Sequence, residues 1–198
     1  MPSENKVQFN LHNVRYAVLA EATGENGITY SYGTPVPVPG AVTLTLDPSG
    51  DSTPFYADGI AYYTTVANNG YEGDLEIARV PEQMLTDVWG MVKNSDNVIV
   101  ETAGVEAKPV ALLYQIDGDI TGQLYVLYKC TLGRPGIGST TNTDTKEPQT
   151  QSMSIAATPR DDYKIKAHTT ANTSDTIRNG WFSAVYDVAA QAPEQTGN

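Results

Sequence analysis

The sequence predicts a mainly β protein, an antiparallel β-sandwich or barrel-like domain with one flanking α-helix and extended loops and termini. Three observations indicate this fold class. The chain has 12 Tyr and many Val and Thr, side chains that pack well on a pleated sheet. Its 17 Gly and 12 Pro supply many turns. Several segments alternate apolar with polar residues at the two-residue period of a half-buried strand.

The length and composition fit one domain. With 198 residues and a hydrophobic fraction of 40%, the chain can fill a single core. We expect one β domain over residues 1–190, with an N-terminal arm, and a flexible tail at residues 191–198. The only cysteine, Cys130, follows an apolar run. We expect it in the core, because a single thiol forms no intrachain disulfide.

The first strands are expected at residues 14–19 and 41–46. In the second of these, three apolar residues alternate with two threonines, so the apolar side chains share one face. Segment 34–40, between the two strands, contains three prolines. Because proline donates no ladder hydrogen bond, this segment is expected to be an extended connector or a sheet edge.

A loop and then a hairpin are expected in the next part of the chain. The run DPSGDSTP at residues 47–54 is rich in turn formers and predicts a long loop. Residues 60–66 and 71–77 have strand-like patterns, and Asn69-Gly70 lies between them. This residue pair is typical of a hairpin turn, so we expect the two strands to pair with each other.

One α-helix is expected at about residues 81–90. Pro81 suits the first helical position, Glu82 lies in the positive first turn, and Gly90 can end the last turn. Four apolar residues fall at helical spacing and predict one buried face: Met84, Leu85, Val88 and Trp89. For Trp89, this core position is favoured over a role in stacking on a cofactor.

The remaining strands follow from the same alternation and are expected at residues 97–102, 110–116, 121–128, 151–157, 163–168 and 181–187. The sequence Asp117-Gly118-Asp119 predicts a hairpin turn between the second and third of them. Residues 133–149 are polar and rich in Gly and Thr, so we expect a mobile loop there.

The charge of the chain is strongly negative and unevenly distributed. The net charge is −11, and no Lys or Arg occurs between Arg15 and Arg79, a stretch that holds eight acidic residues. This argues against a protein that grips nucleic acid, which requires cations to replace the counterions of the phosphates. Acidity that only maintains solubility is one interpretation. The other is a surface that lies near DNA without adhering to it.

The sequence contains no recognisable catalytic motif. His12 and His168 are the only histidines, and neither lies in a motif for nucleophilic or metal-assisted hydrolysis. The glycine-rich run at residues 133–138 does not lead from a strand into a helix with a lysine, as a phosphate-binding loop would. We therefore predict no catalytic and no cofactor-binding residue, and we expect that the protein is not an enzyme.

Two groups of carboxylates have the chemistry of metal ligands or of catalytic acids. Asp47, Asp51 and Asp58, or Asp117 and Asp119, have the oxygen ligands that Ca²⁺ prefers. They lie in no complete calcium loop, however, and Asp-Gly pairs are common turn formers. A second set alternates along one expected strand and so shares one face: Glu72, Asp74 and Glu76. We interpret these as solvated acids rather than a glycosidase pair, and we predict no metal site.

No signal peptide or membrane-spanning segment is expected. The N-terminal sequence MPSENKVQFNLHN lacks a basic region followed by an apolar block. No apolar run in the chain approaches the length that crosses a bilayer. Folding in a reducing cytoplasm is therefore the expectation.

Much of the chain resembles a known family. The strings PGAVTLTLDPSGDSTPFYADGIAYY and NNGYEGDLEIARVPEQML, between Pro39 and Leu85, resemble the phi13-like family of major tail proteins. VRYAVL followed by YGTPVPVPGA is similar to the opening of that family, as is TDTKEPQTQSMSIAATPRDD at residues 143–162. The resemblance covers roughly residues 6–185.

The resemblance implies a structural protein of a long-tailed phage or prophage virion, assembled in the cytoplasm of a bacterial host. Tail tube subunits of this kind form hexameric rings that stack into a hollow tube around the tape measure protein. Tail terminator and distal tail proteins are the implied partners at the tube ends. DNA then passes through the bore without specific binding, and no membrane contact is implied.

Two surfaces are candidates for this function. The segment from Asp47 to Asp58 is a protruding candidate for contacts between rings, with five residues of interest: Asp47, Asp51, Phe55, Tyr56 and Asp58. Phe55 and Tyr56 either anchor such an interface or fold back on their own domain, and the sequence leaves both open. Glu72, Asp74 and Glu76 are the candidates for an acidic lumen face, which would repel phosphates.

The sequence is also compatible with two functions other than a phage tail tube subunit. One is a soluble β-sandwich that binds carbohydrate by stacking sugars on Tyr62 and Tyr63, or on Tyr125 and Tyr128. The other is a tube subunit of a phage-derived tailocin or secretion device, which would use the same fold. An enzyme that uses carboxylates is the least favoured class.

Overall fold

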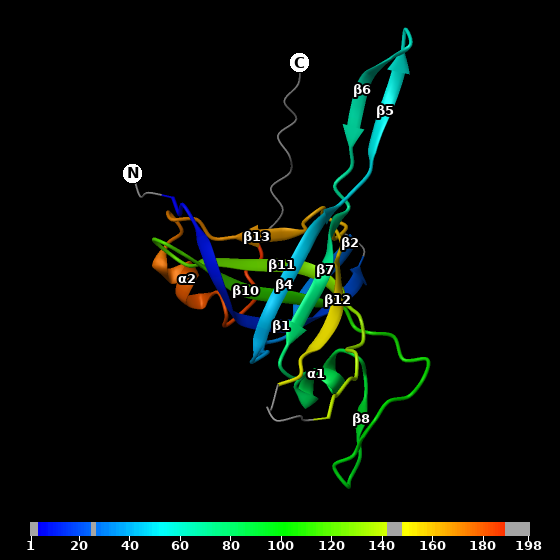
Figure 1. Cartoon of the computed structure of the whole chain (residues 1–198), viewed down its shortest axis with the longest axis vertical. Coiled ribbons are helices and arrows are strands. Elements are labelled where there is room, and N and C mark those ends of the chain that lie inside the picture. Colours follow the sequence, from blue (N-terminus) through cyan, green and yellow to red (C-terminus); the bar gives the residue numbers. More distant parts are fainter. Residues whose placement is uncertain (1–3, 25–26, 142–147, 189–198) are drawn as a thin grey trace.

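The computed structural model describes residues 4–24, 27–141 and 148–188. Half of the chain lies in strands and 7% in helices, which confirms the mainly β prediction. Figure 1 shows a body of crossed strands with projections at both ends of its long axis. The expected tail at residues 191–198 lies outside the described residues, as do residues 142–147 of the expected loop.

Nine strands of the described residues form one antiparallel sheet in the order β2-β1-β10-β11-β12-β7-β4, in which β3 pairs with β1 and β13 pairs with β11. Their bounds are β1 Gln8–Gly24, β2 Gly27–Tyr32, β3 Val36–Pro37, β4 Ala41–Ser49, β7 Gly70–Ile77, β10 Val110–Gly118, β11 Gln123–Leu132, β12 Gln151–Ala157 and β13 Lys166–His168. The strands predicted at 14–19, 41–46, 71–77, 110–116, 121–128 and 151–157 are confirmed. Segment 34–40 contributes only the short edge strand β3, as its prolines require.

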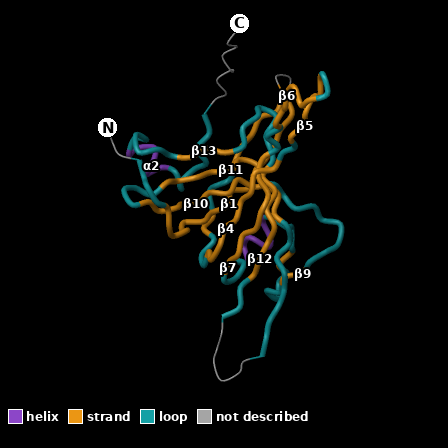
Figure 2. The backbone as a smooth tube through the Cα atoms, turned by 45° about the horizontal axis from the view of Figure 1, so that its top comes forward, coloured by secondary structure: helices purple, strands orange, loops and turns teal. Residues whose placement is uncertain are grey.

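The sheet folds over itself at β11. β12 pairs with the last residues of β11, Cys130 to Leu132, whereas β13 pairs with Tyr125 to Leu127. Strands β12, β7 and β4 therefore leave the plane of β1, β10 and β11 and cross it (Figures 1 and 2). Residues of both layers fill the space between them in one apolar core, including Tyr16, Leu75 and Met153. The result is the sandwich-like arrangement expected for a β domain.

Helix α1 (Glu82–Asp87) closes one end of this core. It is shorter than the expected 81–90: Pro81 precedes its first residue, and Gly90 adopts a φ of 63°, which ends the turn that follows. Met84 and Val88 are fully buried. The indole Nε1 of Trp89 donates a hydrogen bond to the Leu132 carbonyl at 3.1 Å, so the predicted core position of Trp89 is confirmed.

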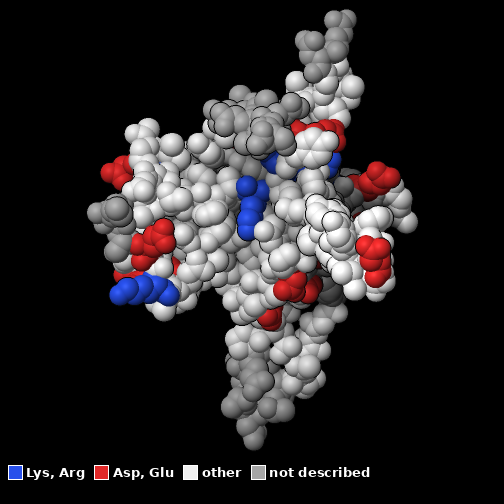
Figure 3. Space-filling model, turned by 90° about the horizontal axis from the view of Figure 1, so that it is seen from above, with Lys and Arg blue, Asp and Glu red and all other residues white. Residues whose placement is uncertain are grey.

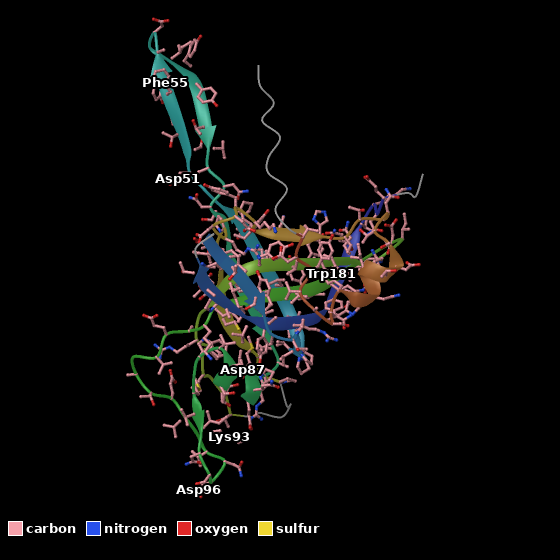
Figure 4. All side chains as sticks on the ribbon, turned by 180° about the vertical axis from the view of Figure 1, so that it is seen from behind. Asp51, Phe55, Asp87, Lys93, Asp96 and Trp181 are labelled. Atoms are coloured by element: carbon pink, nitrogen blue, oxygen red, sulfur yellow. The ribbon has the colours of Figure 1, made fainter. Side chains whose placement is uncertain are left out.

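The opposite face of β1, β10 and β11 is also covered. Helix α2 (Asp175–Gly180) and the segment after it pack there, with Trp181 only 2% exposed (Figure 4). The strand predicted at 181–187 is wrong. Its alternation arises because Trp181 and Tyr186 stack on each other over the sheet, with ring centroids 5.1 Å apart, while the backbone turns.

Three smaller predictions need correction. The strand expected at 97–102 is only β9 (Ile99–Val100), which pairs with β8 (Val92–Lys93) in a separate projection at the end opposite the arm described below (Figure 1). The strand expected at 163–168 is only β13, because residues before it form a tight turn. β10 and β11 do form an antiparallel hairpin, but the turn lies at residues 119–122 rather than at 117–119, because Asp117 and Gly118 still belong to β10 and pair with β1.

A buried ionic network fixes the turn between β12 and β13 to the rest of the domain. Arg160 is 4% exposed. Its guanidinium forms ion pairs with Asp162 and, at 2.6 Å, with Asp187, and it donates a hydrogen bond to the Tyr32 hydroxyl at 2.9 Å. Lys164 Nζ contacts the same Asp187 at 2.7 Å. The network therefore joins the β12–β13 turn, β2 and the segment after α2.

We expect this network to make stability fall in acid. Hydrogen bonds from Arg160 lower the pKa of Asp162 from 3.8 to about 2. Because the folded-state pKa lies below the unfolded-state value, the network stabilises the fold above about pH 4, and this contribution is lost as the pH falls towards 2. Asp162→Asn should lower the unfolding free energy at pH 7 by about 2 kcal/mol. Chemical denaturation should show a much smaller difference between variant and wild type at pH 2.5 than at pH 7, because the Asp162 carboxylate is partly protonated at the lower pH.

Candidate assembly surfaces

The segment expected to be a loop is instead half of a long projecting hairpin. β4 continues to Ser49, and residues Ser52–Ala57 form β5, which pairs with β6 (Ile60–Val66). The chain reverses at Asp58-Gly59, where both residues have positive φ, 52° and 78°. A two-residue hairpin turn requires this geometry, and an Asp-Gly pair supplies it. The predicted loop at 47–54 is therefore wrong.

The hairpin predicted through Asn69-Gly70 is also wrong. β6 pairs with β5, and β7 pairs with β4 and β12, so the chain passes straight from β6 into β7. Two backbone hydrogen bonds bridge the interruption: Ala67 N donates to Asp51 O at 3.0 Å, and Asn69 N donates to Ser49 O at 2.8 Å. Gly70 is needed here because its φ is 108° and a Cβ would overlap the Ala157 carbonyl oxygen.

We call the outer half of this hairpin, residues 52–66, the arm. It points away from the body of the domain, with Asp51 at its base and Phe55 near its tip (Figures 1 and 4). Phe55 is 62% exposed and Tyr56 is 66% exposed, so neither folds back on its own domain. Successive strand residues point to opposite faces, so both faces of the arm present an aromatic ring. Four more large apolar side chains of the arm are exposed: Ile60, Tyr62, Tyr63 and Val66.

The arm lacks the support that a stable hairpin needs. A two-stranded hairpin without a further layer is marginally stable in water, and large apolar patches on a protein surface mark sites of interaction. We therefore expect chymotrypsin to cut the unassembled protein first after Phe55, Tyr56, Tyr62 or Tyr63. Mass spectrometry of the first fragments checks this; initial cleavage in the β10–β11 region would contradict it.

The three acids predicted to share one face of a strand do share it. Glu72, Asp74 and Glu76 share the outer face of β7, while Leu75 and Ile77 between and after them are fully buried. Their cross-strand neighbours are small or polar: Thr43, Thr45 and Asp47 on β4, and Ser152, Ser154 and Ala156 on β12.

Asp47 lies opposite Glu72 in this face, so it does not belong to the protruding segment predicted from Asp47 to Asp58. No Lys or Arg occurs in β4, β7 or β12, so the carboxylates have no basic neighbour on these strands. More widely, acidic groups are spread around the outline of the molecule in Figure 3, and basic groups are fewer.

Two strands end the main sheet. β4 and β2 are its terminal members, and each pairs through one side only within the described residues. An unpaired strand edge presents backbone donors and acceptors to another chain. Lysine and proline commonly block such edges. β4 contains no Lys, and its one Pro, Pro48, lies near its last residue.

The side chains of His12, Asp117 and Cys130 have local structural roles. The Nε2 atom of His12 lies 2.8 Å from Asp117 Oδ1. Hydrogen bonds from Asn10 and then His12 lower the pKa of Asp117. Burial raises the pKa of the Cys130 thiol to about 12, which removes it as a nucleophile at neutral pH.

The carboxylates with calcium-type oxygen ligands do not converge on one site. Asp119 accepts a hydrogen bond from Lys6 N at 2.8 Å, and Asp47, Asp51 and Asp58 lie in the acidic face, at the base of the arm and at its tip. Over residues 4–24, 27–141 and 148–188, no group of three or more His, Cys, Asp or Glu side chains is arranged to hold a metal ion.

One pair of tyrosines considered for sugar stacking is unavailable. Tyr128 is 2% exposed. Tyr125 is stacked between Tyr114 and His168, at centroid distances of 5.0 and 5.4 Å. The other pair, Tyr62 and Tyr63, is exposed on the arm.

The helices in the described part of the chain are all too short or too polar to cross a bilayer.

Sequence reasoning missed two features of these surfaces. The arm was hidden by its Pro, Ser and Gly residues, although Asp58-Gly59 is a hairpin signal as good as Asn69-Gly70. The Arg160 network joins residues far apart in sequence, so no local pattern indicates it.

Comparison with protein-family models and with curated proteins finds no match for this chain.

Proposed function

We propose that this chain is a structural subunit whose copies form stacked rings and so build a hollow tube, the major tail (tail tube) protein of a long, non-contractile phage or prophage tail. The arm is the observation that carries the proposal. It exposes six large apolar side chains on a hairpin that its own domain does not support. Such a surface becomes stable when a partner covers it.

The composition of the arm suits a protein interface. Aromatic side chains are enriched at the energetically dominant positions of interfaces, and the arm exposes four of them. Because each Phe or Tyr can bury about 150–250 Å², one docked arm supplies a large part of the roughly 800 Å² per partner of a standard interface.

The free edges of the sheet suit the ring. An edge of one copy can pair with an edge of the next, and this head-to-tail contact closes into a ring when the rotation per copy fits. β4 and β2 are different surfaces at opposite ends of the sheet order, as such a contact requires. The number of six copies per ring comes from the resemblance described above.

The acidic face suits a bore through which DNA travels. Glu72, Asp74 and Glu76, with Asp47, would repel phosphates and prevent the counterion release that drives binding to DNA. The tape measure protein occupies the bore before DNA does, and tail terminator and distal tail proteins cap the tube.

The test is the state of the purified full-length protein as its concentration rises. Light scattering should show growth from the 21.3 kDa monomer to large particles, and negative-stain microscopy should show rings or open-ended tubes. A monomer that persists at high concentration and binds glycan-coated beads through Tyr62 and Tyr63 would favour the carbohydrate-binding alternative. A tailocin or secretion-device subunit would also form tubes, but would occur in particles that carry no DNA.

A further inference from the structure

An apolar groove opens on the body of the domain where the two layers of the sheet diverge. Its volume is about 380 Å³. Gln8, Asn10 and Lys166 are the polar residues of its lining. Much of the rest consists of apolar side chains of β1, β4 and β10: Phe9, Leu11, Leu44, Leu46, Tyr114 and Ile116. Most of them are only half-buried, and Phe9 is 55% exposed. The groove is therefore a part of the apolar core that the chain itself does not cover.

The local backbone explains why the groove is open. Asn10 adopts a φ of 58°, and the register of β1 on β10 shifts between Phe9 and Leu11. β4 is the last strand of its layer, so no further strand continues the layer over the groove. Lys166 and Tyr71 also line the groove, and the Lys166 ammonium lies 4.4 Å from the centre of the Tyr71 ring. The described residues supply no carboxylate at ion-pair distance from Lys166.

We infer that this groove receives the arm of another copy of the same chain. This inference rests on the proposed self-assembly and names the surface that the arm contacts. The arm supplies the matching chemistry: its aromatic rings fit an apolar cleft, and its tip carries the exposed carboxylate of Asp58. The arm has no Lys or Arg, whereas the groove has Lys166 at its rim.

The contact joins different copies rather than two parts of one molecule. The arm points away from the body that holds the groove (Figures 1 and 4). Arm and groove are also different surfaces, so each copy gives one arm and receives another. When the contact is head-to-tail it repeats from copy to copy, as the stacking of successive rings requires. A reciprocal exchange of arms between two copies would instead close a dimer and give no cross-linked product longer than a dimer.

Cross-linking of paired cysteines tests the contact. Full-length protein with Ile60→Cys in the arm and Phe9→Cys in the groove is treated with a short bis-maleimide reagent. Both positions are exposed, and the natural Cys130 is buried and unreactive. Because each copy then carries both halves of the contact, denaturing gels should show a ladder of dimers, trimers and longer products.

Matched controls separate this contact from random collision. Each single-cysteine variant should give at most dimers. Ile60→Cys with Val98→Cys, an exposed position in the β8–β9 projection, should give no ladder. Adding Lys166→Glu should reduce the ladder about three- to fivefold, and adding Asp58→Lys as well should restore it. A ladder no stronger than that of the Val98 control would overturn the inference.

Microscopy of the same samples distinguishes this inference from the proposed function. Tubes without a ladder would overturn the groove as the arm's docking site and leave the tube proposal standing. A ladder without rings or tubes would support arm-in-groove docking and contradict the tube. An intramolecular cross-link, seen as a faster-moving monomer, would contradict docking between copies.

Discussion

Phe55→Ala together with Tyr56→Ala should give a folded monomer that forms no tubes. Both side chains are more than 60% exposed, so their truncation removes little packing from the domain and should change its unfolding free energy by less than about 0.5 kcal/mol. At an interface, each truncated aromatic anchor costs about 2 kcal/mol or more. The loss occurs at every copy of the contact, so long assemblies should disappear completely.

Thermal unfolding and negative-stain microscopy check this double variant. Tyr163→Ala is the matched control, because Tyr163 is an aromatic residue that is 88% exposed outside the arm. The control should form tubes like the wild type. Normal tubes from the arm variant would remove the stacking role of Phe55 and Tyr56.

Reversing Glu72, Asp74 and Glu76 to Lys should make assembled tubes retain DNA. The three positions share one face of β7 with no basic residue on the neighbouring strands, so the reversal creates a continuous row of cations. Such a row releases counterions from DNA, and retention should weaken steeply as salt rises. In virions, the same change should slow DNA ejection.

The control variant carries the same change in net charge at positions outside the acidic face. Asp96, Glu106 and Asp175 are exposed acids outside the acidic face, and their reversal to Lys changes the net charge by the same amount. A fluorescent DNA fragment should sediment with tubes of the β7 variant and much less with tubes of the control. If both variants retain DNA equally, or neither does, the carboxylates of β7 do not line the bore.

Local patterns predicted the body of the fold well. Where a strand has one buried face, as in β7 and β12, apolar residues must alternate, and the alternation is visible in the sequence. In β4 the alternation holds for Leu44 and Leu46 only, because the register shift between Ala41 and Thr43 leaves Val42 53% exposed. α1 was also found, because Pro81 and Gly90 mark its surroundings and its apolar face is regular. The residue pattern of each of these elements follows from its own burial, so a single sequence is enough to predict them.

The arm and its pairing were not predictable in the same way. A hairpin exposed on both faces needs no alternation, and β5 and β6 show none in their burial. Both Asp58-Gly59 and Asn69-Gly70 are suitable turn pairs. Only the pairing of β7 with β4 and β12, far away in sequence, decides between them. Likewise, the aromatic residues after α2 resemble a strand but pack singly on a sheet face.

The groove could not be found from the sequence, because it lies between strands from three parts of the chain. Leu11, Leu44 and Ile116 each look like ordinary core residues in their own strands. Only the crossing of the two layers shows that they remain partly uncovered.

A three-dimensional reconstruction of particles assembled from the full-length protein tests the central claim most directly. We expect a hollow cylinder of identical copies, with each arm buried against a neighbouring copy and the acidic strands facing the bore. A closed dimer with the arms still in solvent, or a protein that never assembles, would contradict the account.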